Sequence, residues 1–98
     1  RYVEGYPVVE NDPAAIALAG QVAGEIVGED RVDLEFPRMM GSEDFAYMLQ
    51  VCPGALVRIG NGPSDGGRGL HNPRYDFHDG NLAVGAAFWS RLAEQFLA

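Results

Sequence analysis

A histidine delivered by a glycine-rich loop is the sharpest chemical feature of the sequence. His71 follows the loop at residues 60–69 and stands two positions before Pro73. The proline restricts the backbone just before it, so this loop can hold an imidazole in a fixed direction. Neutral imidazole is among the commonest protein ligands for zinc and related metals. His71 is therefore a candidate metal ligand, although a surface histidine without a role is the simpler explanation from spacing alone.

A second candidate site lies where a predicted strand gives way to a short helix. Gly41, Ser42, Glu43 and Asp44 stand at that junction. The free N–H groups of a helix start, and the carboxylates beside them, can meet a ligand bound at the edge of a sheet. Glu43 and Asp44 could bind metal, act as a base or hold a substrate group. Ordinary capping by Ser42, with acids favoured by the helix dipole, explains the same residues.

Three other features give weaker chemical signals. His78 could share one ion with His71, and the spacing neither requires nor excludes this. Cys52 could be a nucleophile beside a histidine, but core packing is the default interpretation of a single cysteine. The glycine-rich stretch Gly60–Gly69 lacks the Gly-Lys-Ser or Gly-Lys-Thr ending of a phosphate loop and is predicted to be a hinge.

Composition and charge exclude several classes of partner. The chain has 98 residues, of which 47% are hydrophobic and 21% charged, as expected of one globular unit. Its net charge of -7 and the lack of a basic run argue against nucleic acid and anionic membranes as partners. No apolar stretch approaches the roughly 20 residues of a membrane span. With one cysteine there is no internal disulfide, which favours a cytoplasmic setting.

The elements that must position these residues alternate between strands and helices. Asp12 and Pro13 mark the start of a helix that Gly28 ends, and Asn81 is the predicted cap of a last helix. This pattern predicts an α/β fold. The expected strands cover 2–9, 31–36 and 55–59, and the expected helices cover 13–27, 43–50 and 82–97.

The predicted helices carry apolar residues on more than one side. On the helix at 13–27, Ile16 and Ala19 lie on one stripe while Leu18 and Val22 lie on another. Two or three strands with such helices do not close a core. We therefore expect this segment to complete a larger sheet, supplied by residues outside this chain or by a partner chain.

Taken in order, the motifs resemble the C-terminal end of one enzyme family. It is the aminoacylase, carboxypeptidase and hippurate hydrolase branch of the metal-dependent amidohydrolases. The resemblance spans nearly the whole chain, and residues 6–12 resemble the exit from that family's inserted lid domain. The motifs are Gly41-Ser42-Glu43-Asp44-Phe45, Pro53-Gly54, Leu70-His71-Asn72-Pro73, Tyr75-Asp76-Phe77 and Gly85-Ala86 in the final helix.

The resemblance implies a fold and an assembly. It implies a three-layer α-β-α catalytic domain of the zinc-peptidase type, which is incomplete in this chain. Residues 1–10 would be the exit from the lid, or dimerisation, domain, and residues 11–98 the C-terminal part of the catalytic domain. The rest of the catalytic domain would be a partner of this segment, and the intact protein would be a homodimer.

The resemblance also implies a reaction. His71 would be the last ligand of two divalent metal ions, zinc, manganese, cobalt or nickel, which activate a water that cleaves an N-acyl amino acid. The substrate-binding residues would be Gly41, Ser42, Glu43, Asp44 and Asn72. The other ligands and the glutamate base would precede this segment, so it holds no catalytic residue and is expected to be inactive alone.

One departure and one alternative stay open. The family commonly has Asn followed by two acids where this chain reads His78-Asp79-Gly80, which leaves the role of His78 undecided. The alternative function is a non-catalytic α/β interaction module that pairs with another chain through an exposed sheet edge.

Overall fold

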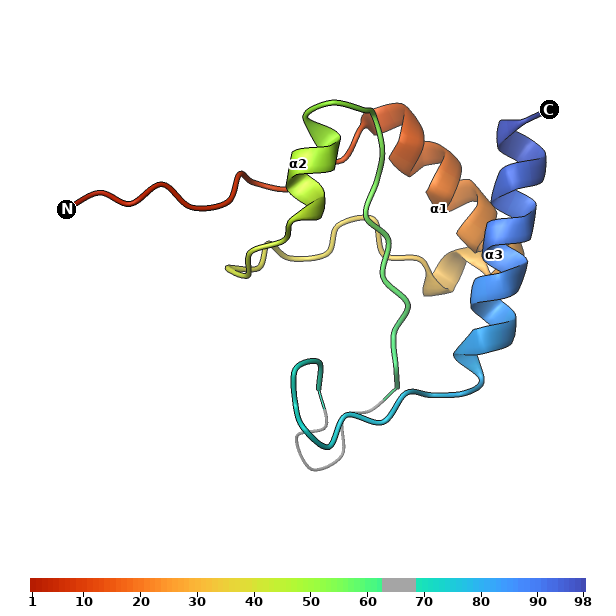
Figure 1. Ribbon diagram of the computed structural model, residues 1–98. Coiled ribbons are helices and arrows are strands. Elements are labelled where there is room, and N and C mark those ends of the chain that lie inside the picture. Colours follow the sequence, from red (N-terminus) through yellow and green to blue (C-terminus); the bar gives the residue numbers. More distant parts are fainter. Residues whose placement is uncertain (63–68) are drawn as a thin grey trace.

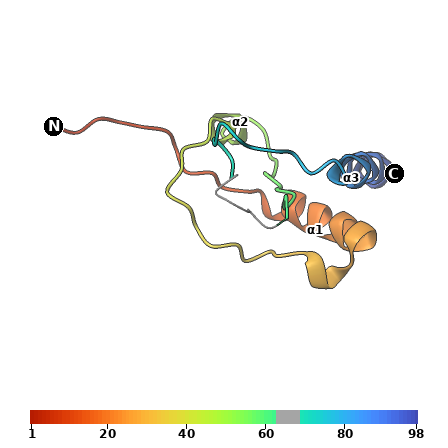
Figure 2. The ribbon, with the colours of Figure 1, turned by 90° about the horizontal axis from the view of Figure 1, so that it is seen from below.

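Helices joined by long irregular segments make up residues 1–62 and 69–98, the part of the chain that the computed structural model describes (Figure 1). The two long helices, α1 and α3, lie side by side, as two views at right angles show (Figure 2). The elements in chain order are α1 (Pro13–Val27), a 3-10 turn η1 (Glu29–Arg31), α2 (Phe45–Leu49) and α3 (Asn81–Phe96).

Helix α1 begins and ends where local sequence signals place it. The Asp12 carboxylate accepts a hydrogen bond from the Ala15 N–H at 2.9 Å, and Pro13 occupies the first position of the helix. Gly28 ends the helix with a φ of 92°, a backbone region that side chains rarely adopt. The predicted helix at 13–27 is therefore confirmed, together with its cap.

The core lies between α1 and α3. Ala19 and Val22 of α1 are buried against Phe88 of α3. Apolar side chains that are partly buried surround this contact, and they are Leu18, Ala23, Ile26 and Leu92. Burying these side chains removes apolar surface from water, which is the force that holds the two helices together.

Two predicted helix starts were wrong in their details. Ser42 does not cap α2, because that helix begins at Phe45 with Asp44 in the capping position. Asn81 does not cap α3, because it is the first helical residue and its amide instead donates to the Gly60 carbonyl oxygen at 3.0 Å. Both residue types often cap helices, and for Asn81 the bond to Gly60 takes the place of a cap.

The predicted strands do not form within residues 1–62 and 69–98, so the expected α/β sheet is not confirmed there. A strand exists through hydrogen bonds to a neighbouring strand. Residues 2–9 are instead irregular, and the N-terminal end of the chain lies away from α1 and α3 in both views (Figures 1 and 2). Residues 31–36 and 55–59 are likewise irregular. The alternation of Val32, Leu34 and Phe36 therefore marks a strand-forming sequence that lacks a described partner strand.

The chain leaves much apolar surface uncovered. Its accessible surface is 8391 Å², whereas a folded monomer of this mass exposes about 5,500 Å². Its radius of gyration is 15.4 Å, against about 13 Å for a compact domain of similar length. Leu82, Trp89 and Phe96 are exposed on α3, although α3 packs on α1. Exposed apolar surface of this extent is typical of a region that contacts other structure, and packing of this segment against further structure stays a prediction.

The structure bears on the prediction about membrane spans and does not test the assignment of residues 1–10. Among the described residues, no helix has both the length and the hydropathy that crossing a membrane requires. The assignment of residues 1–10 to the exit from a lid domain stays a prediction. In that segment the ring of Tyr6 lies 5.5 Å from the ring of Tyr47 in α2.

Candidate functional site

His71 lies in a tight turn with an unusual backbone. The Asn72 N–H donates to the Gly69 carbonyl oxygen at 3.1 Å and closes the turn. His71, at the third position, has a φ of 67°, and no other non-glycine residue in the described part of the chain has a positive φ. The left-handed region costs a residue with a side chain roughly 1–2 kcal/mol. A strained backbone of this kind is often found at functional sites.

Asn72 organises the next turn. Its Oδ1 accepts from the Arg74 N–H at 2.8 Å, and its carbonyl oxygen accepts from the Tyr75 N–H at 2.9 Å. An Asx turn forms when the side chain of Asn or Asp accepts a hydrogen bond from the backbone N–H two residues later in the chain. This motif stabilises a bend outside helices and strands. The described structure therefore gives Asn72 a conformational role, and its predicted contact with substrate stays a prediction.

Asn61 makes two bonds to the segment that follows His71, and the sequence analysis did not predict them. Its Nδ2 donates to the Asp76 carbonyl oxygen at 2.8 Å, and its Oδ1 accepts from the His78 N–H at 2.7 Å. One amide thus bonds the backbone on both sides of Phe77, as a neighbouring strand would. Bonds of this kind leave no periodic pattern in the sequence. The only sequence signal for them was an asparagine between two glycines, Gly60 and Gly62.

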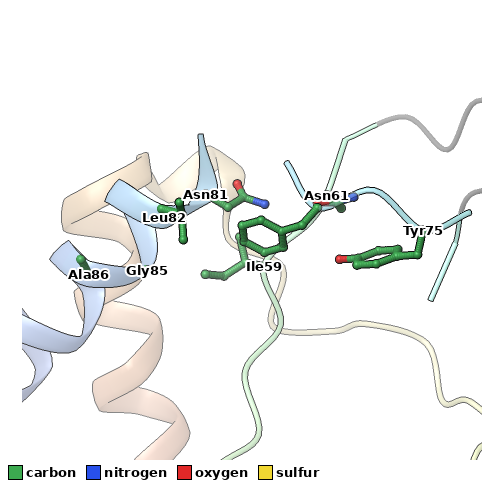
Figure 3. Close-up of a pocket in the computed structure, with 8 residues that line it drawn as sticks. Ile59, Asn61, Tyr75, Asn81, Leu82, Gly85 and Ala86 are labelled. Atoms are coloured by element: carbon green, nitrogen blue, oxygen red, sulfur yellow. The ribbon is translucent and has the colours of Figure 1, made fainter. Parts of the chain in front are cut away.

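A hollow of about 300 Å³ opens beside this amide (Figure 3). Figure 3 shows Asn61 and Tyr75 on one side and residues of the first turns of α3 on the other. Among residues 1–62 and 69–98 the lining carries no charged side chain, and it includes Ile59, Tyr75, Phe77, Asn81 and Leu82. The hollow therefore offers apolar contact and neutral polar groups.

The second candidate region, residues 41–44, leads into α2. Gly41 and Ser42 are exposed, and Glu43 is half-buried. The Asp44 side chain caps none of the described N–H groups of α2. Figure 1 places α2, which directly follows Asp44, above the turn at residues 69–75, with the start of the helix on the side of the turn. Within residues 1–62 and 69–98, Glu43, Asp44 and His71 do not form a group that could hold a metal ion, and the roles predicted for them stay predictions.

The described residues could supply one ligand to a metal site, but they do not form a complete metal site. Residues 1–62 and 69–98 contain no group of three or more His, Cys, Asp or Glu side chains that could hold an ion. A protein metal site of the zinc type needs at least three such ligands. His71 fits a shared site because its imidazole is exposed and bonds to no described residue.

The other two candidate side chains have different surroundings. The His78 imidazole lies against Gly80 at the start of α3, close enough that a Cβ at Gly80 would lie 3.3 Å from Nε2. The exposed Cys52 thiol contacts the Pro53 carbonyl oxygen at 3.6 Å. In the described part of the chain, neither residue belongs to a metal-binding cluster. The predicted packing of Cys52 in the core was wrong, because the short helix that precedes it leaves it at the surface.

Three of the known proteins that match this chain are named as hydrolases. A protein named "Probable hydrolase" from Synechocystis sp. is 32% identical over 97 residues, which are 97% of this chain and 25% of the relative. The hippurate hydrolase of Campylobacter jejuni is 32% identical over 91 residues, 93% of this chain and 23% of the relative. An IAA-amino acid hydrolase of Arabidopsis thaliana is 32% identical over 94 residues, 94% of this chain and 20% of the relative.

The matches cover nearly all of this chain but only a small part of each relative. The chain spans about a quarter or less of the length of these three proteins. No solved structure matches it. The family described as Peptidase family M20/M25/M40 matches residues 1–95. Because that match covers nearly the whole sequence, the chain belongs to the peptidase family M20/M25/M40.

Proposed function

We propose that this chain is the C-terminal part of a metallo-amidohydrolase that cleaves N-acyl amino acids into a carboxylic acid and a free amino acid. The observation that carries the proposal is the family match over residues 1–95, joined by relatives named as hydrolases of hippurate and of IAA-amino acids. The intact protein would have the three-layer α-β-α catalytic domain and would form a homodimer in the cytoplasm.

In this proposal His71 supplies one metal ligand. Its exposed imidazole and left-handed backbone support that role, because strain is retained where a side chain must point in one direction. Two divalent ions, zinc, manganese, cobalt or nickel, would supply Lewis-acid chemistry that lowers the pKa of water and stabilises an oxyanion. Gly41, Ser42, Glu43, Asp44 and Asn72 would contact the substrate.

The exposed apolar surface supports the view that further structure completes the site. Leu82, Trp89 and Phe96 of α3 are open to solvent in this chain. We infer that the remaining catalytic domain covers them and brings the other ligands to His71. The alternative function, pairing through an exposed sheet edge, finds no support, because residues 1–62 and 69–98 form no strand.

The test is His71→Ala in the intact protein, assayed with hippurate and with bound metal measured on the same sample. We expect loss of hydrolysis and of bound metal. His78→Ala is the matched control, because it removes the other imidazole of this chain and leaves the backbone bond to Asn61 in place. Full hydrolysis and full metal content in His71→Ala would end the proposal.

A further inference from the structure

The amide of Asn61 closes the base of the loop that carries His71. It bonds the Asp76 carbonyl oxygen and the His78 N–H, which lie 15 and 17 residues further along the chain. A second amide, that of Asn81, holds the neighbouring Gly60 carbonyl oxygen. Residues 60 and 61 are therefore joined to residues 76 and 78 and to the start of α3.

A continuous series of short-range bonds leads from this base to His71. The turn closed by the Asn72 N–H and the Gly69 carbonyl oxygen contains His71. The next turn, closed by the Tyr75 N–H and the Asn72 carbonyl oxygen, follows without a gap. Asp76, which Asn61 bonds, is the next residue. The position of the His71 backbone is thus fixed relative to the Asn61 amide by consecutive turns.

The strained backbone at His71 requires such a restraint. A residue with a side chain leaves the left-handed region unless the surrounding structure holds it there. The described helices α1 and α3 form their core without His71, because that core consists of Ala19, Val22 and Phe88. In the described part of the chain, the bonds that can hold the turn include those of the turns themselves and those of Asn61.

We propose that Asn61 is a positioning residue that fixes the direction of the His71 imidazole toward a bound metal ion. This inference rests on the proposed function, in which His71 is a metal ligand. Asn61 does not touch the ion itself; it acts through the backbone of residues 69–78. Groups that orient a metal ligand typically change metal affinity by about 10- to 100-fold when removed.

Asn11 provides a matched control. Its Oδ1 accepts from the Leu56 N–H at 2.9 Å, a bond between distant parts of the chain like the bond of Asn61 to His78 at 2.7 Å. Asn11 lies at the start of α1, outside the loop that carries His71. At similar side-chain volume, Asn11→Leu removes one side-chain to backbone bond and Asn61→Leu removes two, so Asn11→Leu reports the stability cost of losing such a bond outside the loop.

The experiment uses the intact protein with Asn61→Leu, Asn11→Leu, His71→Ala and the double variant of Asn61→Leu with His71→Ala. The affinity for Co²⁺ is measured by competition with a chelator, and the stability of the metal-free protein by urea unfolding. We expect Asn61→Leu to weaken Co²⁺ binding by about tenfold or more. We expect Asn11→Leu to bind Co²⁺ as the parent does, and the double variant to bind no more weakly than His71→Ala.

The outcomes separate this inference from the proposed function. Equal Co²⁺ affinity in Asn61→Leu and Asn11→Leu, with weakened binding in His71→Ala, would overturn the role of Asn61 and leave His71 as a ligand. Parent affinity in His71→Ala would overturn both. A further loss in the double variant would show that Asn61 acts by another route and would overturn the inference.

A milder variant keeps the test decisive if Asn61→Leu does not fold. Asn61→Asp retains an acceptor for the His78 N–H and removes the donor to the Asp76 carbonyl oxygen. Co²⁺ affinity below that of Asn11→Leu supports the inference, and affinity equal to it overturns the inference. Amide hydrogen exchange over residues 69–78 gives a readout without metal, and it should be faster in Asn61→Asp than in Asn11→Leu.

Discussion

The Arg91 guanidinium of α3 donates through Nε to the Glu25 carboxylate of α1 at 2.8 Å and joins the two helices beside their apolar contact. The Gln95 amide donates to the same carboxylate at 2.8 and 3.1 Å. The bond from Arg91, followed by that from Gln95, lowers the pKa of the Glu25 carboxyl below its ordinary value of 4.5. The folded state therefore favours the ionised form of Glu25.

This relationship predicts a stability difference that depends on pH. A carboxyl whose pKa is lowered by folding stabilises the fold above its unfolded pKa, and the contribution is lost as pH falls through the folded pKa. We expect Glu25→Gln to destabilise the α1–α3 pair at neutral pH. The difference from the parent should vanish in acid, well below the ordinary pKa of 4.5. Amide hydrogen exchange of α1 and α3 across this pH range is the measurement.

Glu94→Gln is the control for that prediction. Glu94 also accepts from Arg91, at 3.2 Å, but it lies three residues away on the same helix and joins nothing to α1. We expect this variant to change exchange in α1 little at any pH. Added salt should reduce the effect of Glu25→Gln, because the pair is exposed. An equal effect of both variants on α1 would contradict the assignment.

The stability of the packed α1–α3 pair should depend on Phe88 and not on Trp89. Phe88 is 7% exposed and packs on Val22, whereas Trp89 is 68% exposed. Truncation of a buried phenylalanine costs about 3–5 kcal/mol, which is comparable to all the stability that so small a core supplies. We expect Phe88→Ala to abolish the helical circular dichroism of the 98-residue chain. Trp89→Ala should retain most of it, and equal losses in both variants would contradict the core described above.

The helices show what local signals can and cannot predict. Asp12, Pro13 and Gly28 act within a few residues of the helix ends, so the bounds of α1 followed directly from the sequence. Asn81 carries the same kind of signal, but its amide bonds Gly60, which is 21 residues away. A contact over that distance leaves no local pattern. The start of α3 was consequently predicted one residue late.

The strands and the site were predicted less completely. The alternation at 31–36 indicates which side chains share a face, but a strand forms only when a partner supplies hydrogen bonds. For the site, the residue type and the loop indicated His71. Its left-handed φ of 67° and the bonds made by Asn61 arise from tertiary structure and could not be read from spacing.

The isolated 98 residues should hydrolyse no N-acyl amino acid. The described part of the chain offers no cluster of three potential metal ligands, and catalytic zinc sites use three protein ligands with a water or substrate in the fourth position. We expect turnover of hippurate by the isolated chain to equal that of a metal-only blank with zinc, manganese, cobalt or nickel. The intact protein in the same assay is the positive control. Turnover above the blank would show that the chain holds a complete site.

Because the backbone at His71 is left-handed, we expect substitutions at this position to differ in stability while they lose activity alike. Glycine adopts a φ of 67° without the clash that a Cβ makes, so His71→Gly should relieve the strain that His71→Ala retains. We expect the metal-free intact protein to be about 1 kcal/mol more stable with glycine than with alanine at this position. Both variants should lose hydrolysis of hippurate, because both lack the imidazole. Urea unfolding and the hydrolysis assay together check this, and an alanine variant as stable as the glycine variant would show that the turn is not strained.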